Sequence, residues 1–99
     1  MKYRISDKAF EDIESIWFYT MEKWSVDQAD RYYDLIFEEI EQIAEYPLRG
    51  KDYNHIRKNY RRSKIKSHFI FYKYNKNDEF IDIIRILHQS MDIEVRLLE

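Results

Sequence analysis

The last quarter of the chain brings an arginine, a histidine and an aspartate close together. Arg85 lies inside the apolar run FIDIIRIL at residues 80–87, and His88 and Asp92 follow it. An imidazole with a pKa near ~6.5 can gain or lose a proton at neutral pH. An arginine among apolar side chains needs an acidic partner or an anionic ligand, because an unpaired buried charge is very costly. The cluster is either the remnant of an active site or the junction between a buried strand and a last helix.

Strand alternation indicates which side each of these residues takes. It places Arg85 with Ile81, Ile83 and Leu87, and His88 with Ile84 and Ile86. We interpret Arg85 as an anchor for a helix carboxylate or an anionic ligand. We interpret His88, Met91 and Asp92 as a structural hinge, in which His88 hydrogen-bonds a carboxylate or a backbone group.

A second group of chemically active residues is the basic segment 57–66. It contains six cations, namely Arg57, Lys58, Arg61, Arg62, Lys64 and Lys66. In a strand, Tyr60, Arg62, Lys64 and Lys66 share one face, and Arg61, Ser63 and Ile65 share the other. This pattern is typical of an edge strand protected by lysines against aggregation. It is equally typical of a surface for a polyanion or an acidic partner segment, held by salt-sensitive contacts.

The net charge of −2 hides a strong separation of charge along the chain. Residues 7–45 carry twelve acidic and three basic side chains, whereas residues 49–76 carry ten basic side chains and one acidic one. The two segments therefore have net charges of −9 and +9. We expect one basic face that meets an acidic partner, nucleic acid or protein. The alternative is two solvated faces that only balance each other.

Several classes of function are disfavoured. The three histidines are 13 and 20 residues apart and there is no cysteine, so the spacing predicts no metal site. A single glycine leaves no phosphate-binding glycine loop, and we expect no cofactor. No apolar run approaches the ~18 residues of a membrane span, and the charged N-terminus is unlike a signal peptide. We expect a soluble, cytoplasmic protein that does not bind membranes.

The elements that must position these residues begin with a short strand, KYRI, and two helices. Ser6 is placed to cap the first helix, and Ser25 with Gln28 forms a capping box at the start of the second. Pro47 ends the second helix. The predicted apolar stripes are Ala9, Phe10, Ile13, Ile16, Trp17, Thr20, Met21 and Trp24, then Ala29, Tyr32, Tyr33, Ile36, Phe37, Ile40, Ile43 and Ala44. Almost no loop joins the helices, so we expect an antiparallel hairpin.

Beyond Gly50 the pattern changes to that of strands. Residues 60–74 form two strands with a break near Lys66 and Ser67, and NKND at 75–78 is a hairpin turn. Residues 80–87 form a central strand covered on at least one side, and Asp92 caps a short last helix. The prediction is one α+β domain over residues 1–99. An N-terminal strand and the helical hairpin pack on a mostly antiparallel sheet, and a short helix ends the chain.

Three stretches resemble the RelE/ParE superfamily of bacterial toxins, and within it the ParE-like branch. The first two are the helical ISDKAFEDIESIWFYTMEKWS with QADRYYDLI, and IRKNYRRSKIKSHFIFYKYN, which is similar to an arginine-bearing strand followed by H-x-I-F-Y. The third, IIRILHQSMDIEVRL, resembles the signature R-V-L-H-x-x-M-D-x-x-x-x-L. The resemblance implies a toxin of a type II toxin–antitoxin pair, neutralised by a small antitoxin that is ParD-like or of another kind. ParE-like members inhibit DNA gyrase, whereas RelE-like members cleave messenger RNA on the ribosome.

The residues favour the gyrase inhibitor over the nuclease, and so a protein that is not itself an enzyme. If it is an mRNA endoribonuclease, the catalytic residues are Arg61, Arg85 and His88. The late tyrosine of several such nucleases has no counterpart here, because Gln89 follows His88. The residues that we expect to bind the target or the antitoxin are Arg57, Arg61, Arg62, Lys64, Arg85, Met91 and Arg96.

The chain departs from the ParE-like pattern at three positions. Ser67 and Ser90 stand where arginine is common in that branch, and Arg96 stands where histidine is common. A third function is therefore a non-toxic relative that only binds its antitoxin.

Overall fold

The computed structural model describes residues 1–99 as a five-stranded sheet with three helices. In chain order the elements are β1 (Lys2–Ile5), α1 (Asp7–Lys23), α2 (Val26–Glu45), β2 (Lys51–Asp52), β3 (Tyr60–Ile65), β4 (His68–Lys73), β5 (Phe80–His88) and α3 (Ile93–Leu98). The predicted α+β architecture is confirmed.

Serine caps start both long helices, as predicted. The Ser6 hydroxyl accepts a hydrogen bond from the Ala9 backbone N–H at 3.0 Å and donates one to the Ile84 carbonyl at 2.8 Å. One side chain therefore begins α1 and ties it to β5. The Ser25 hydroxyl accepts from the Gln28 N–H at 3.1 Å to begin α2, which ends one residue before Tyr46 and the following Pro47.

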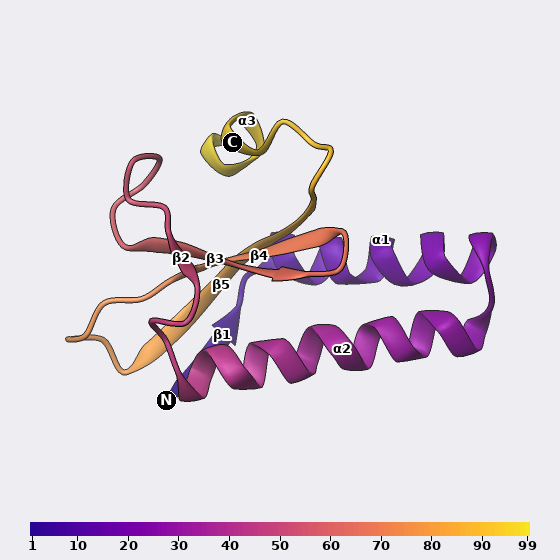
Figure 1. Ribbon diagram of the computed structural model, residues 1–99, viewed down its shortest axis with the longest axis horizontal. Helices are drawn as coiled ribbons and strands as arrows, with labels where there is room; N and C mark the ends of the chain where they lie inside the picture. The colour runs from indigo at the N-terminus through magenta and orange to yellow at the C-terminus, as the bar shows by residue number, and fades with distance from the viewer.

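The two helices form an antiparallel hairpin that runs along one face of the sheet and projects beyond the ends of the strands (Figure 1). Ala9, Ile13 and Ile36 are buried between the helices and the sheet. The predicted burial of Phe10 and Trp24 is wrong, because these side chains are 48% and 76% exposed. Trp24 caps the far end of α1, where no strand covers it. Phe10 lies about 100° around the helix from Ala9, outside the buried stripe.

The sheet has the strand order β1-β5-β4-β3-β2, with β1 parallel to β5 and the other neighbours antiparallel. The predicted break between the two basic strands is a tight turn at Lys66, whose φ is 48°. The second hairpin, over residues 74–79, joins β4 to β5 as expected.

Apolar side chains cover both faces of β4 and β5. On one face, Ile70, Tyr72 and Ile83 join the core made with α1 and α2. On the other face, Phe71 and Leu87 pack with Leu97 of α3, which lies across the sheet from the hairpin (Figure 1). The continuous apolar run at 80–87 is thus explained by burial on two sides.

A register shift in β5 changes which side chains share a face. Ile83 lies opposite Tyr72 and Arg85 lies opposite Phe71, so Ile84 is an extra residue in the ladder. The alternation is therefore interrupted, and Arg85 and Leu87 point to the α3 side. Ile81 and Ile83 point to the helical hairpin. The prediction that Arg85 shares a side with Ile81 and Ile83 is wrong, and its grouping with Leu87 is confirmed.

None of the helices is long and apolar enough to cross a lipid bilayer.

Candidate functional site

Arg85 is anchored by the first long helix. Its Nε and Nη2 donate to the two carboxylate oxygens of Asp12 at 2.8 and 3.0 Å. The Asp12 carboxylate also accepts the Ile86 backbone N–H at 2.9 Å, beyond the point where β1 stops pairing with β5. Hydrogen bonding to Asp12 raises the pKa of Arg85. Of the two partners expected for this arginine, the helix carboxylate is the one present.

A pocket of about 310 Å³ opens beside this ion pair, between the start of α1, the end of β5 and α3. It brings together Arg57, Arg85 and Arg96, three of the seven expected binding residues. Lys8 and Glu99 also line it. Lys8 was not predicted, because nothing local in the helical pattern indicates that it lies near the C-terminus.

His88 lies at a different pocket, of about 400 Å³, together with Met91, Ser15, Tyr19 and His68. Its Nδ1 accepts the Ser90 backbone N–H at 3.1 Å and lies 2.7 Å from the Ser90 hydroxyl. This bond fixes the connection between β5 and α3, in line with the hinge that we expected. The His88 ring also stands perpendicular to that of His68, with centroids 5.1 Å apart.

His68 is hydrogen-bonded to a tyrosine of α2 and has a lowered pKa. The Tyr32 hydroxyl donates to the Ile65 carbonyl at 3.2 Å and lies 2.6 Å from His68 Nδ1. Because a hydroxyl has one proton, both contacts are satisfied together when Nδ1–H of His68 donates to Tyr32. Burial, with a smaller effect of His88, lowers the pKa of His68 to about 4. His68 is therefore neutral at physiological pH, a property that its sequence spacing did not indicate.

Arg61 occupies a third location. Its Nη1 donates to the Gly50 carbonyl at 2.6 Å, and the residue lines a pocket of about 450 Å³ with Leu48 and Tyr74. Arg61 lies opposite Tyr72, so its side chain is on the face of the sheet that the helical hairpin covers. Arg85 lies opposite Phe71, so its side chain is on the α3 face. The three residues of the expected nuclease set thus line three separate pockets and do not converge on one.

Arg62 and Lys64 lie on the α3 face of β3, away from all four of the main pockets. The Arg62 guanidinium carbon is 4.3 Å from the centroid of the Phe69 ring. The predicted sharing of one face is confirmed for Tyr60, Arg62 and Lys64 by their pairing partners on β4. It is wrong for Lys66, which lies in the turn after β3 with a φ of 48°.

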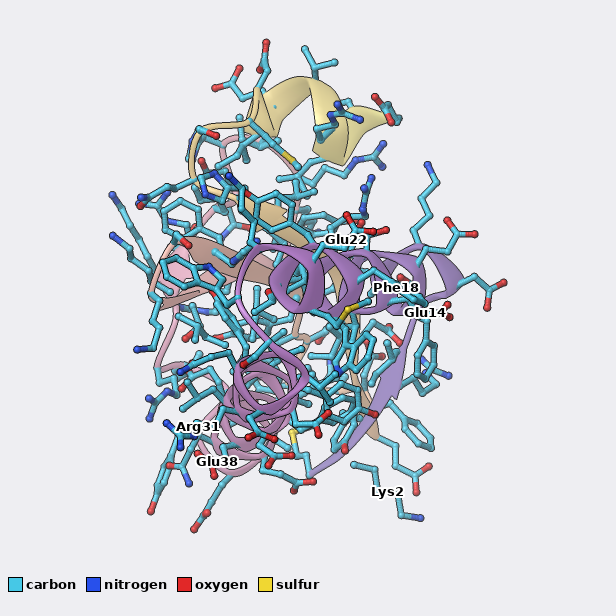
Figure 2. All side chains as sticks on the ribbon, turned by 90° about the vertical axis from the view of Figure 1, so that its right-hand side faces the viewer. Lys2, Glu14, Phe18, Glu22, Arg31 and Glu38 are labelled. Atoms are coloured by element: carbon cyan, nitrogen blue, oxygen red, sulfur yellow. The ribbon has the colours of Figure 1, made fainter.

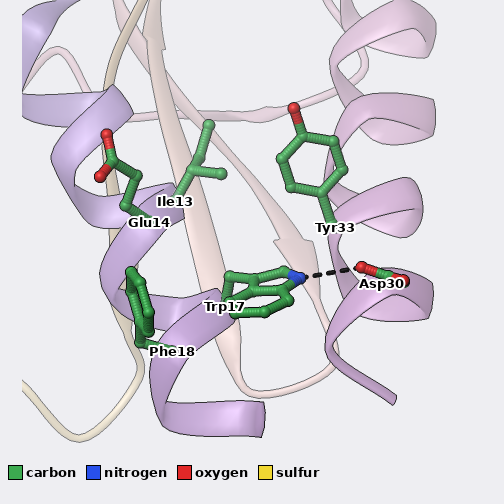
Figure 3. A pocket seen from close by; sticks show the side chains of 6 residues that line it. All are labelled: Ile13, Glu14, Trp17, Phe18, Asp30 and Tyr33. Carbon is green, nitrogen blue, oxygen red and sulfur yellow. Dashed lines mark hydrogen bonds between the residues drawn. The ribbon is translucent and has the colours of Figure 1, made fainter. Parts of the chain in front are cut away.

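The helical hairpin carries an aromatic groove that the sequence analysis did not select. A pocket of about 290 Å³ is lined by Ile13, Glu14, Trp17, Phe18, Asp30 and Tyr33. The Trp17 indole lies across the space between the helices, with Nε1 donating to Asp30 at 3.0 Å (Figure 3). Tyr33, which we predicted to be in the core, is 44% exposed here. An exposed aromatic groove rimmed by carboxylates is typical of a protein-binding surface.

Acidic side chains surround this end of the molecule. Viewed onto the tip of the hairpin, Glu14, Phe18 and Glu22 of α1 point to one side, and Arg31 and Glu38 of α2 point to the other (Figure 2). The negative segment predicted from the sequence therefore forms the hairpin, and its helix α2 meets the basic segment where Glu39 pairs with Arg49.

Both the sequence and the fold of this chain match those of known proteins. The family model described as the ParE toxin of the type II toxin–antitoxin system parDE matches residues 3–93. Toxin ParE1 of Caulobacter vibrioides is 39% identical over 95 residues, which cover 96% of each chain. Toxin ParE1 of Mycobacterium tuberculosis is 35% identical over 96 residues, which cover 97% of each chain.

A solved structure from a chromosomal ParDE toxin–antitoxin system of P. aeruginosa has the same fold. The TM-score is 0.76 at 16% sequence identity, with 89% of this chain and 95% of that chain covered. The family match extends over the helical hairpin, the sheet and the β5–α3 junction that holds Arg85 and His88. This chain belongs to the ParE family of toxins from type II toxin–antitoxin systems.

Proposed function

We propose that this protein inhibits DNA gyrase and is kept inactive by a cognate antitoxin of the ParD type. The observation that carries the proposal is the separation of Arg61, Arg85 and His88 in a chain of the ParE family. A ribonuclease needs a base, an acid and cations around one phosphate. Here Arg85 is bound to Asp12, Arg61 is bound to Gly50, and His88 faces another pocket. An inhibitor that acts by binding does not need these residues to meet.

Two surfaces are suited to the two partners of such a toxin. The aromatic groove between α1 and α2 supports binding of an antitoxin segment with apolar side chains and basic flanks, because Glu14 and Asp30 line it. The basic pocket of Arg57, Arg85 and Arg96 supports contact with an acidic part of the target, whereas Met91 lines the separate pocket of His88. We place this action in the cytoplasm, where gyrase and the antitoxin are found.

One observation favours a ribosome-dependent mRNA endonuclease as the second candidate. His88 lines an open pocket next to His68, so an RNA phosphate could reach its imidazole. A third candidate, a non-toxic protein that only binds its antitoxin, is favoured by Ser90, which hydrogen-bonds His88 where other ParE-like chains often carry arginine.

Controlled expression in a bacterial host separates the three candidates. A gyrase inhibitor gives filamentous cells and induction of the DNA-damage response before protein synthesis falls. Rapid arrest of translation with cleaved messages would contradict the proposal and identify the nuclease. Unimpaired growth with a stable, folded protein would also contradict it and identify the non-toxic binder. Co-expression of the antitoxin should restore growth in the first case.

A further inference from the structure

Three cations lie together on the α3 face of β2 and β3. Lys51 of β2 lies directly opposite Arg62 of β3, so both side chains leave the sheet on the same face. Lys64 follows Arg62 on that face, about 6.6 Å further along the strand. We call Lys51, Arg62 and Lys64 the cationic strip.

The strip has no acidic partner inside the protein. The four ion pairs of the molecule use Lys2, Arg4, Arg49 and Arg85, and none uses a residue of the strip. Like charges directly opposite each other across two strands destabilise a sheet. Residues 7–45 contain twelve acidic side chains, but none of them forms an ion pair with Lys51 or Arg62. An uncompensated pair of this kind is suited to an anionic partner that binds from outside.

Aromatic rings lie beneath two of the three cations, Arg62 and Lys64. The Arg62 guanidinium carbon is 4.3 Å from the Phe69 centroid and 5.3 Å from that of Tyr53. The Lys64 ammonium is 5.9 Å from the Phe69 centroid. These contacts cover the ring faces, so Phe69 and Tyr53 do not offer a platform on which bases could stack.

The surroundings of the strip favour nucleic acid over an acidic protein segment. A protein interface needs an apolar centre into which partner side chains pack. No strip residue lines any of the four main pockets, and the rings near it are covered by cations. A phosphate backbone needs no such centre, because it presents regularly spaced charges to lysine and arginine.

We propose that the cationic strip binds the phosphodiester backbone of nucleic acid without reading its sequence. Since base stacking is not available, affinity depends on charge density, and duplex DNA should bind more tightly than a single strand. The inference goes beyond gyrase inhibition and is measured without gyrase, so either proposal can fail while the other stands.

The test is a fluorescence-anisotropy titration of labelled duplex DNA with the full chain. The strip variant is K51Q/R62Q/K64Q. Its control is K2Q/K23Q/R31Q, which removes the same charge at three exposed positions away from the strip. Circular dichroism and thermal melting confirm that both variants are folded. Unlabelled single-stranded DNA, RNA of the same sequence and polyglutamate serve as competitors.

We expect a Kd on the order of 10⁻⁵ M for wild type and control near physiological salt, and at least a tenfold loss in the strip variant. Three phosphate contacts give a slope of about −2.7 for log K against log salt with duplex DNA, and about −2.1 with a single strand. Equal binding by the strip variant and the control would overturn the proposal. So would competition by polyglutamate at the same charge concentration, which would identify an acidic protein segment as the ligand.

Discussion

At the scale of single residues, the value of an ion pair depends on its burial. Arg85–Asp12 and Arg4–Asp82 have the same Nε–carboxylate distance of 2.8 Å. The side chains of the first pair are 13% and 15% exposed, and those of the second are 59% and 31% exposed. The two pairs therefore form a matched comparison of one interaction in two environments.

We predict a large coupling for the buried pair and a small one for the exposed pair. Double-mutant cycles use Asp12→Asn with Arg85→Gln, and Asp82→Asn with Arg4→Gln. Asparagine keeps an oxygen that can accept the Ile86 N–H, so the cycle isolates the charge. We expect a coupling free energy of about 2–3 kcal/mol between Asp12 and Arg85 from urea unfolding. Equal couplings for the two pairs would show that burial does not set the strength of the Arg85 anchor.

His68 should make the stability of the protein depend on pH. Its pKa of about 4 in the folded protein is below the ordinary value of 6.5, so the unfolded chain binds more protons between these two pH values. The free energy of unfolding therefore falls as pH is lowered from 6.5 to 4. Its slope against pH is at most that of a difference of one bound proton between the unfolded and folded states. His68→Asn can keep a donor toward Tyr32 and should flatten this dependence. A slope that persists in folded His68→Asn would contradict the assignment.

His88→Ala tests whether this histidine is a structural or a chemical group. The change removes the acceptor for the Ser90 N–H, an exposed contact, so we expect a loss of stability of about 1 kcal/mol. Growth arrest on expression should remain within about tenfold of wild type, because general acid–base catalysis alone contributes roughly 10²–10⁴-fold. Complete loss of toxicity in a folded variant would restore the nuclease to first place.

The sequence shows that a side chain requires a partner more readily than it shows which residue the partner is. It established that Arg85 requires an anionic group, because the residues around it are apolar. It could not select Asp12, which lies 73 residues away on a helix with several other carboxylates. The neutral state of His68 was missed for the same reason, since it depends on burial against Tyr32 and the ring of His88.

At the scale of elements, a tyrosine hydroxyl joins the end of α2 to the sheet. Tyr72 of β4 donates to the Pro47 carbonyl at 2.7 Å and accepts the Gly50 N–H at 2.9 Å. Burial raises the pKa of this hydroxyl. Gly50 is required here, because a Cβ at this position would lie 2.6 Å from the Arg62 carbonyl oxygen.

Tyr72→Phe should destabilise the fold by about 2–3 kcal/mol, because it leaves a buried N–H and a carbonyl without their partner. Tyr3→Phe is the control, since its hydroxyl bonds Glu41 at an exposed site and should matter little. The measurement is the midpoint of chemical unfolding for the three proteins. Equal midpoints for the two variants would contradict a structural role of the Tyr72 hydroxyl.

The elements themselves were largely predictable. Ser6, Ser25 and Pro47 act locally, and within each of β3, β4 and β5 the strand alternation is kept except at Ile84. The register shift at Ile84 could not be predicted, because it depends on pairing with β4. The exposure of Trp24 could not be predicted either, because a helical pattern does not state how far a hairpin extends past its sheet.

At the scale of the whole molecule, the two charged segments occupy different places. The acidic residues of 7–45 are on the projecting hairpin, and the basic residues of 49–76 extend from the loop before β2 to the hairpin between β4 and β5. The separation in the sequence predicted a basic face. Of the seven expected binding residues, however, only Arg57, Arg85 and Arg96 meet in one pocket, while Met91 and Arg61 line others. Sequence distance does not show which loops meet at the end of a sheet.

A supercoiling reaction with purified gyrase, relaxed plasmid and this protein tests directly whether the protein inhibits gyrase. We predict loss of supercoiling with accumulation of linear DNA, and relief of both when the antitoxin is added first. Arg57→Gln combined with Arg96→Gln should weaken inhibition while Arg31→Gln, at an exposed position on α2, should not. Full supercoiling in the presence of excess folded protein, with gyrase from the source organism, would contradict the account.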